Sequence, residues 1–326
     1  MSNYQVLRLL LCACLTAIAA LLLSLLSGSV DITVGDLLAY TSRSLPALEN
    51  QVLAEIRIPR SLAAFATGAA LALAGVLMQV LLRNPLADPY ILGLSGGAAV
   101  AALACITLGF AGAWLSSAAL LGALVSVFLV FSIAGRAGHW STIRLLLTGV
   151  VLSAGWGALI NLMLATSASA SVQGMLFWLM GDLSQSRTGW LQWFVLFAGA
   201  AAALSQARSL NVLVRGETSA ASLGVNVRGL RLGLFVGASL LTAMAVMTAG
   251  SVGFVGLVVP HMLRLLGARD HRLLIPLSLL LGGAFLLIAD TLARTLLAPQ
   301  QLPVGVITAL IGVPSFIAIL KSTPSQ

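Results

Sequence analysis

Residues 61–82 read SLAAFATGAALALAGVLMQVLL, an apolar stretch that contains no Asp, Glu, Lys or Arg. A transmembrane helix needs about 20 apolar residues to cross roughly 30 Å of hydrocarbon, so this stretch predicts a membrane span. Its small residues, Gly68 and Gly75 among them, would let neighbouring helices approach closely, which is how helices associate inside a bilayer. The stretch therefore predicts one helix of a membrane bundle.

The composition of the whole chain also indicates a membrane protein. Of its 326 residues, 60% are hydrophobic and only 8% are charged, and the mean hydropathy is +1.06. A soluble domain carries about a quarter of its residues as charged side chains, so a surface this poor in charge must face lipid. Because no polar stretch is long enough for a soluble domain, we predict a single membrane domain over residues 1–326.

Ten apolar stretches are candidate spans. They cover residues 7–27, 61–82, 92–111, 114–134, 145–166, 190–206, 230–250, 254–267, 273–293 and 304–320. The sixth and eighth are short, and Pro260 interrupts the eighth near its start. A short or broken helix is tolerated in a bilayer only inside a bundle, where its backbone groups find partners. The predicted fold class is an all-α polytopic membrane protein with about ten transmembrane helices.

The basic residues predict the orientation, because cytoplasmic loops are enriched in Lys and Arg. With the N-terminus in the cytoplasm, five of the 17 basic residues lie outside: Arg43, Arg57, Arg60, Arg187 and Arg294. The others lie inside: Arg8, Arg83, Arg136, Arg144, Arg208, Arg215, Arg228, Arg231, Arg264, Arg269, Arg272 and Lys321. Since they are scattered between apolar stretches, topology explains the net charge of +8 better than nucleic-acid binding does. Both termini are predicted in the cytoplasm.

Two polar segments are candidate interaction sites. Inside, residues 216–224 (GETSAASLG) predict a short helix that Gly224 would end in a left-handed conformation; an ordinary connector is the alternative. Outside, Ile56-Arg57-Ile58-Pro59-Arg60 places a proline where a helix begins, with Arg57 just outside the helix and Arg60 in its first turn. Cations oppose the dipole at a helix N-terminus, so these arginines indicate an acidic partner or, alternatively, lipid headgroups.

Asp290 and Arg294 lie four residues apart in the ninth stretch and can pair on one helix face. Ionisable residues inside spans mark either a pathway or a pairing, and the sequence leaves both open.

Catalytic motifs are few. Gly93-Leu94-Ser95-Gly96-Gly97 matches G-x-S-x-G and resembles a motif of intramembrane serine proteases, which makes proteolysis a remote alternative. A nucleophile elbow needs a strand before the serine, and no strand is predicted; His261 is the only histidine near a span. The same glycines form G-x-x-x-G, a helix-packing pattern. The sequence contains no P-loop and no H-E-x-x-H, so we predict neither ATP hydrolysis nor a metal site in this chain.

Several motifs, in this order and spacing, resemble the FecCD-type permease family. They are residues 56–60 (IRIPR), 68–79 (GAALALAGVLMQ), 84–89 (NPLADP) followed by Leu92-Gly93, 144–147 (RLLL), 223–224 (LG), 253–261 (GFVGLVVPH), 302–305 (LPVG) and 312–316 (GVPSF). These permeases are membrane subunits of bacterial ATP-binding-cassette (ABC) importers for ferric siderophores, haem and cobalamin. The resemblance covers essentially the whole chain and implies the type II ABC importer architecture.

The resemblance also implies partners and location. They are a second copy of the chain, two ATP-binding subunits that hold the ATP and Mg, a periplasmic binding protein, and the bacterial inner membrane. No cofactor is expected on this chain. We expect an iron chelate as substrate because most of the family serves iron, and Ile143 stands where some cobalamin permeases carry a hydroxyl.

Three groups of residues receive roles from the resemblance. Docking of the binding protein is implied for Arg57, Arg60 and Arg294. Coupling to the ATPase is implied for Gly216, Glu217, Ala220, Ala221, Leu223 and Gly224. A cytoplasmic gate is implied for Asn84, Leu86, Ser141 and Thr142.

An ion-coupled secondary transporter is the main alternative function. Such transporters place carboxylates near the middle of the membrane to bind the coupling ion. Here Asp182 lies in an outer segment, and Arg294 can neutralise Asp290. The sequence therefore predicts no coupling-ion site.

Overall fold

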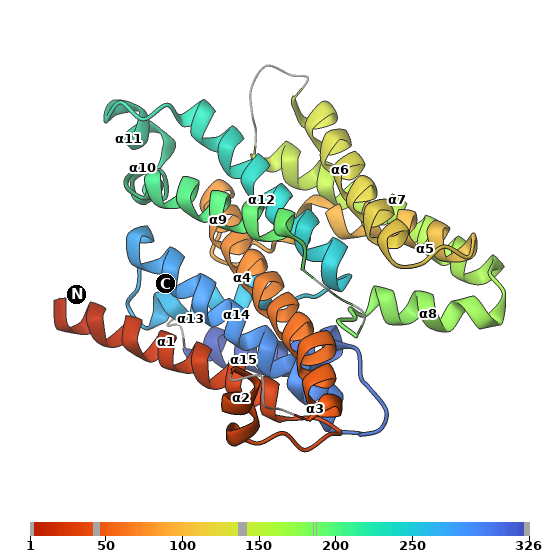
Figure 1. Ribbon diagram of the computed structural model, residues 1–326. Coiled ribbons are helices and arrows are strands. Elements are labelled where there is room, and N and C mark those ends of the chain that lie inside the picture. Colours follow the sequence, from red (N-terminus) through yellow and green to blue (C-terminus); the bar gives the residue numbers. More distant parts are fainter. Residues whose placement is uncertain (1–2, 42–45, 136–141, 185, 187, 323–326) are drawn as a thin grey trace.

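The computed structural model describes residues 3–41, 46–135, 142–184, 186 and 188–322, and all regular elements of these residues are helices (Figure 1). The long helices are α1 (Asn3–Leu26), α4 (Ile58–Leu81), α6 (Ala113–Gly135), α7 (Thr142–Thr166), α12 (Val227–Ala249), α14 (His271–Thr295) and α15 (Val304–Ser322). The shorter ones are α2 (Val34–Thr41), α3 (Ala47–Gln51), η1 (Val52–Arg57), η2 (Pro89–Leu92), α5 (Leu94–Thr107), α8 (Ser169–Leu179), α9 (Trp190–Ser205), α10 (Ala207–Leu213), α11 (Glu217–Ser222) and α13 (Val255–Leu265).

Each of the ten predicted apolar stretches is helical, but about ten full spans are not confirmed. In the described part of the chain, six helices are long and apolar enough to cross a membrane, and a seventh span is possible if α9 and α10, bent by 64° at their junction, count as one. The apolar helices Leu94–Thr107, Val255–Leu265 and Val304–Ile317 are shorter. The predicted shortness of the sixth and eighth stretches is confirmed, because α9 has 16 residues and runs into this bend and α13 has 11. The predicted interruption at Pro260 is wrong, because α13 continues through this residue.

The second span begins earlier than predicted. Helices α3, η1 and α4 continue into one another, and the apolar helix covers Leu48–Leu81. The expected start near residue 61, with Arg57 outside the helix, is therefore wrong, since Arg57 has helical φ and ψ of −74° and −47°. Pro59 lacks an N–H, and its ring would clash with the carbonyl four residues back in a regular α-helix. The π-helical turn η1 directly precedes it, and this wider turn accommodates the proline.

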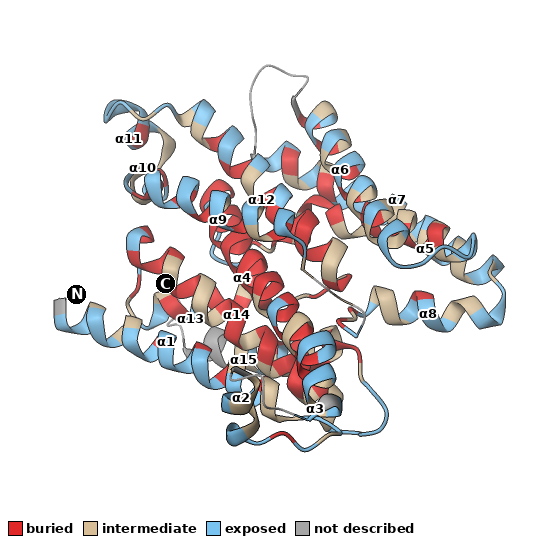
Figure 2. Ribbon diagram, in the orientation of Figure 1, coloured by how far each residue is buried: buried red, intermediate tan, exposed pale blue. Residues whose placement is uncertain are grey.

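Helix α4 lies at the centre of the bundle. It packs on α12, α13 and α14, and buried residues concentrate on α4 and α14 (Figure 2). Two glycines of α4 touch the backbones of its neighbours: an added Cβ would lie 2.2 Å from the carbonyl oxygen of Gly282 at Gly68, and 1.9 Å from that of Gly256 at Gly75. The predicted role of small residues in close helix packing is confirmed.

The outer helices keep apolar surfaces exposed. In the most apolar 18-residue segment of α1, only 22% of the residues are buried within the chain, and in that of α7 only 11%. Exposed apolar faces on helices of this length fit contact with lipid or with another membrane subunit.

Helix α4 also separates two polar ends of the molecule. Arg60 lies in its first turn, and Arg83 follows its last residues. At 1.5 Å per residue these positions are roughly 35 Å apart, close to the thickness of a bilayer core.

Candidate functional site

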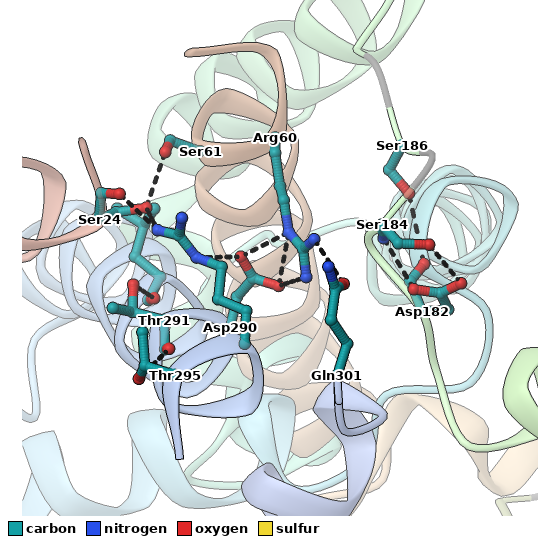
Figure 3. A network of polar contacts seen from close by, with 12 residues as sticks. Ser24, Arg60, Ser61, Asp182, Ser184, Ser186, Asp290, Thr291, Thr295 and Gln301 are labelled. Atoms are coloured by element: carbon teal, nitrogen blue, oxygen red, sulfur yellow. Dashed lines mark hydrogen bonds and ion pairs between the residues drawn. The ribbon is translucent and has the colours of Figure 1, made fainter. Parts of the chain in front are cut away.

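Arg57, Arg60 and Arg294 gather at one end of the bundle, around Asp290; we call these four residues the arginine cluster. Arg60 places Nε 3.0 Å from Oδ2 of Asp290 and Nη2 2.8 Å from Oδ1, and its Nη1 donates to Oε1 of Gln301 at 3.0 Å (Figure 3). The Asp290 side chain is fully buried. The predicted pair of Asp290 and Arg294 is present but longer, at 3.8 Å between Oδ2 and Nε.

Two arginines of the cluster bind the C-terminal end of α1. Arg57 donates from Nη1 to the carbonyls of Leu25 at 2.7 Å and Leu26 at 3.2 Å. Arg294 donates from Nη1 to the carbonyl of Ser27 at 2.9 Å and from Nη2 to the carbonyl of Ser24. The last carbonyls of a helix lack partners within it and form the negative end of its dipole, so these two cations cap α1.

This capping corrects one interpretation of the sequence. The arginines of residues 56–60 were expected to have no helix-stabilising role, because they were considered only against the N-terminus of their own helix. Arg57 instead stabilises the C-terminus of α1, more than 25 positions earlier in the chain. Arg57 and Arg60 are 3% and 7% exposed, and the Arg294 side chain is 10% exposed. The structure thus brings the three predicted docking residues together and gives each a partner within the chain, and docking stays a prediction.

Residues 216–224 form the α11 knob at the opposite end of α4. Gly216 and Gly224 have φ of +136° and +80°. The N–H of Gly224 bonds to the carbonyl of Ala221, and the N–H of Val225 to that of Ala220, both at 3.0 Å, which is a Schellman ending. The predicted short helix and its glycine ending are confirmed.

The α11 knob is fixed at its base and exposed at its tip. Ala220 is fully buried, and Glu217 accepts a hydrogen bond from Nη1 of Arg231 at 2.9 Å. The same carboxylate lies 3.8 Å from Nη2 of Arg83, which joins the knob to the end of α4. Ala221 and Gly224 are exposed, and Leu223 is 70% exposed. An apolar tip on a fixed base suits contact with another protein, and the coupling role stays a prediction.

Two of the four predicted gate residues can be placed. Asn84 and Leu86 are exposed in the loop after α4, where Oδ1 of Asn84 accepts from the N–H of Leu86 at 2.9 Å. Ser141 lies outside the described residues; Thr142 begins α7, but its side chain is not described. In the same loop, desolvation raises the pKa of Asp88 to about 6, opposed by the hydrogen bond from the amide of Tyr90. The gate also stays a prediction.

The structure does not support a protease site. Ser95 lies in the first turn of α5 and, within the described ranges, forms no hydrogen bond with a histidine. It follows the 3₁₀ helix η2, whereas a nucleophile elbow follows a strand. In the part of the chain that the structure describes, no group of three or more His, Cys, Asp or Glu side chains could hold a metal ion.

Some residues that complete these sites carry no signal in the sequence. Gln301 binds Arg60 across 241 positions, and Ser24 accepts from Arg294 across 270. Single polar side chains at such separations show no spacing pattern, so only the folded chain reveals the pairs.

Comparisons with known proteins agree on a transport family. The FecCD transport family matches residues 15–322. The Cobalamin import system permease protein BtuC of Halobacterium salinarum is 43% identical over 280 residues, which are 85% of this chain and 75% of that protein. The Vitamin B12 import system permease protein BtuC of Shigella boydii is 39% identical over 322 residues, 97% of this chain and 95% of that protein.

Solved structures share the fold. A chain described as a metal-chelate type ABC transporter in an inward-facing conformation has a TM-score of 0.85 and 31% identity, and the match covers 97% of this chain and 99% of that one. PsaBC from Streptococcus pneumoniae in complex with Fab has a TM-score of 0.54 and 16% identity over 85% of this chain and 95% of that one, a likeness of fold alone.

These relatives are named as permeases of import systems, and none of their names denotes an enzyme, which supports a multi-pass transport subunit. A match over nearly the full length identifies this chain as a member of the FecCD transport family.

Proposed function

We propose that this chain is the membrane-spanning permease subunit of an ATP-driven importer that moves a metal chelate from the periplasm to the cytoplasm. The α11 knob carries the proposal. It offers an exposed apolar tip on a fixed base, at the end of α4 opposite the arginine cluster. A permease without its own ATPase motif needs such a contact to receive movement from an ATPase subunit.

The substrate proposed first is cobalamin. The relatives that match most of this chain are named as cobalamin or vitamin B12 permeases, at 43% and 39% identity. For the choice of substrate, these names weigh more than the sequence-based expectation of an iron chelate. That expectation rested only on iron chelates being the substrates of most of the family. Ferric siderophores and haem remain the alternatives to test beside it.

The proposed assembly contains two copies of this chain, two ATP-binding subunits and a periplasmic binding protein. An apolar hollow of about 550 Å³, lined by residues such as Met180, Val306 and Leu310, supports a second copy along α8 and α15. The excess of Lys and Arg on the side of the α11 knob supports both termini in the cytoplasm of the inner membrane.

The proposed mechanism is alternating access. ATP binding would draw the two ATPase subunits together and displace the α11 knobs, and the path would open to the opposite side. The knob suits this task because its glycine-bounded ends and the pair of Glu217 with Arg231 hold it as a unit, so it can transmit a displacement.

The rival is an ion-coupled secondary transporter. Its coupling site would need a carboxylate free to bind an ion in the membrane. Asp290 is paired with Arg60 and Arg294, and Asp182 accepts hydrogen bonds from the N–H and Oγ of Ser184 at 2.7 Å. Both observations favour the ATP-driven importer.

Reconstitution tests the proposed function. The chain would be placed in liposomes with its ATPase subunit and binding protein, and uptake of labelled cobalamin and of a ferric siderophore would be measured with and without ATP. We expect uptake of one chelate that requires ATP and both partners. Uptake that continues without the ATPase but stops when the proton gradient is removed would instead establish the secondary transporter.

A further inference from the structure

A basic pocket of about 360 Å³ lies between the end of α4, α13 and the start of α14. Three arginines and two histidines contribute to its lining: Arg83, Arg264, Arg269, His261 and His271. None of its lining residues is acidic. The pocket lies at the same end of α4 as the α11 knob, since Arg83 is 3.8 Å from Glu217.

Arg264 is a partly buried cation without a carboxylate partner. Its Nη1 donates to Oε1 of Gln79, a neutral group, and Nε2 of Gln79 donates to the carbonyl of Gly256 at 3.2 Å, which fixes the orientation of the amide. Among the described residues, neither Arg264 nor Arg269 forms an ion pair. A cation withdrawn from water is stable only when a counter-charge replaces the lost hydration, so the pocket favours an anion.

His271 is the second, independent sign of a ligand. It is 3% exposed, and its Nδ1 lies 2.6 Å from Oδ1 of Asn211. That oxygen also accepts from the main-chain N–H of His271, and Nδ2 of Asn211 donates to Asp270, so the amide is oriented and Nδ1 carries a proton. Nε2 is buried, and the described residues offer it no hydrogen bond. A buried polar atom without a partner calls for one.

The acidic groups near the pocket have other partners. Glu217 accepts from Arg231 at 2.9 Å, and Asp270 caps α14 by accepting from the N–H of Arg272 at 2.9 Å and from Asn211 at 2.8 Å. Glu217 therefore offsets part of the charge of Arg83, whereas Arg264 and Arg269 have no ion pair within the described chain.

We propose that the basic pocket binds a phosphate group, supplied by a soluble phosphate or by the headgroup of an anionic phospholipid. Guanidinium groups match the geometry of phosphate oxygens and form charge-assisted hydrogen bonds with them, and basic pockets between membrane helices bind anionic headgroups. Because Nδ1 of His271 carries the ring proton, Nε2 is an acceptor, and the hydroxyl of a hydrogen phosphate or the glycerol hydroxyl of a phosphatidylglycerol headgroup would donate to it. This inference does not depend on which chelate is transported.

Thermal unfolding of the purified full chain in a neutral detergent tests the proposal in two arms. One arm adds inorganic phosphate, with ionic strength held constant by sodium chloride. The other adds dioctanoyl phosphatidylglycerol, with dioctanoyl phosphatidylcholine as its neutral counterpart. A ligand that binds only the folded chain raises the unfolding midpoint with the logarithm of its concentration. We expect this rise with phosphate, with phosphatidylglycerol or with both, and none with phosphatidylcholine.

Matched variants locate the response. Arg264→Gln and Arg269→Gln should each weaken the apparent Kd about tenfold, as expected for the loss of one charge-assisted hydrogen bond. Arg272→Gln removes an exposed arginine in the first turn of α14 that is outside the lining, and should respond like the wild type. Should Arg264→Gln fail to fold, Arg269→Gln, whose side chain is exposed, carries the test.

A response in one arm alone identifies the source of the phosphate group and supports the proposal. Two results would overturn it: no response in either arm, or equal responses from the wild type and the pocket variants. Loss of the ATPase subunit from co-purified Arg269→Gln, without any response to phosphate or lipid, would mean that a partner carboxylate fills the pocket, and this too would overturn it.

Discussion

Arg60 and Asp290, separated by 230 positions, form a buried ion pair in which both carboxylate oxygens accept from the guanidinium group. The pair joins the first turn of α4 to the last turns of α14, and Arg294 of the same helix lies 3.8 Å from Asp290. Because Arg294 also caps α1, a single carboxylate stabilises the point where three helices meet.

Asp290→Asn should destabilise the protein strongly. The substitution keeps the shape of the side chain but leaves Arg60 and Arg294 as buried cations without a counter-charge, which costs about 3–5 kcal/mol. Thermal or denaturant unfolding in detergent would measure the loss. Asp182→Asn, in a loop where the carboxylate is bound by Ser184, is the control and should cost much less. A loss below about 1 kcal/mol for Asp290→Asn would mean that the pair contributes little.

Gly75→Ala should also destabilise the bundle, by about 1–3 kcal/mol, the usual cost of overpacking. The new Cβ would lie 1.9 Å from the carbonyl oxygen of Gly256, so α4 and α13 must separate. Gly233→Ala in α12 meets nothing within 4 Å and should be neutral or slightly stabilising, because alanine favours a helix over glycine. Equal unfolding midpoints for both variants would contradict the close packing of α4.

Leu223→Ser should weaken the association with the ATPase subunit without changing folding. The side chain is 70% exposed at the tip of the α11 knob, so its burial can be gained only from a partner. We expect about a tenfold weaker complex by co-purification or by a direct binding measurement, corresponding to ~1.4 kcal/mol. Leu108→Ser, which is 71% exposed after α5, is the matched control. An unchanged affinity would place the ATPase contact elsewhere.

Glu217→Gln should reduce transport more than ATP hydrolysis. It removes the charge that binds the knob to Arg231 at 2.9 Å and to Arg83 at 3.8 Å, so the knob would move without carrying the helices with it. Glu217→Arg should be more severe, because it adds a third cation beside these two. The ratio of ATP hydrolysed to substrate imported, measured in liposomes, should rise severalfold. Transport at the wild-type rate in Glu217→Arg would refute the coupling role.

Arg57→Gln should weaken docking of the binding protein at low salt. Reversal of Arg60 or Arg294 to Glu is a poorer test, because it would set a second carboxylate against Asp290 and disturb folding. Arg57 does not pair with Asp290 among the described contacts, and Arg57→Lys keeps the charge as a control. The difference between the variants should shrink as salt rises, since screening removes long-range attraction. Equal affinities at low salt would exclude a docking role for this charge.

Hydropathy located every long helix, because each helix that crosses a bilayer needs about 20 apolar residues. It did not locate the irregular turns and bends within the helices. The turn before Pro59 and the bend between α9 and α10 depend on how neighbouring helices satisfy the backbone, which no local pattern records. Six helices are long and apolar enough to cross a membrane in the described residues, so about ten spans stays a prediction.

The candidate sites were predictable to different degrees. The α11 knob is local, and its two glycines mark its ends in the sequence. The arginines were recognisable as unusual, and the pair of Arg294 with Asp290 was predicted, but their other partners lie 27 to 270 positions away, so the capping of α1 was missed. The pocket around Arg264 was not predicted, because its lining comes from α4, α10, α13 and α14 and the residues at their ends.

The close contacts of α4 have a mechanical consequence. A helix whose glycines touch the backbones of Gly256 and Gly282 cannot slide or rotate without breaking those contacts, since packed interiors deform little. Motion past α4 would therefore leave α13 and α14, which carry Gly256 and Gly282, in place, and would use the short helix α5 or the bent pair α9 and α10. Helix α4, held between α13 and α14, would be the fixed part of the bundle around which α5, α9 and α10 rearrange.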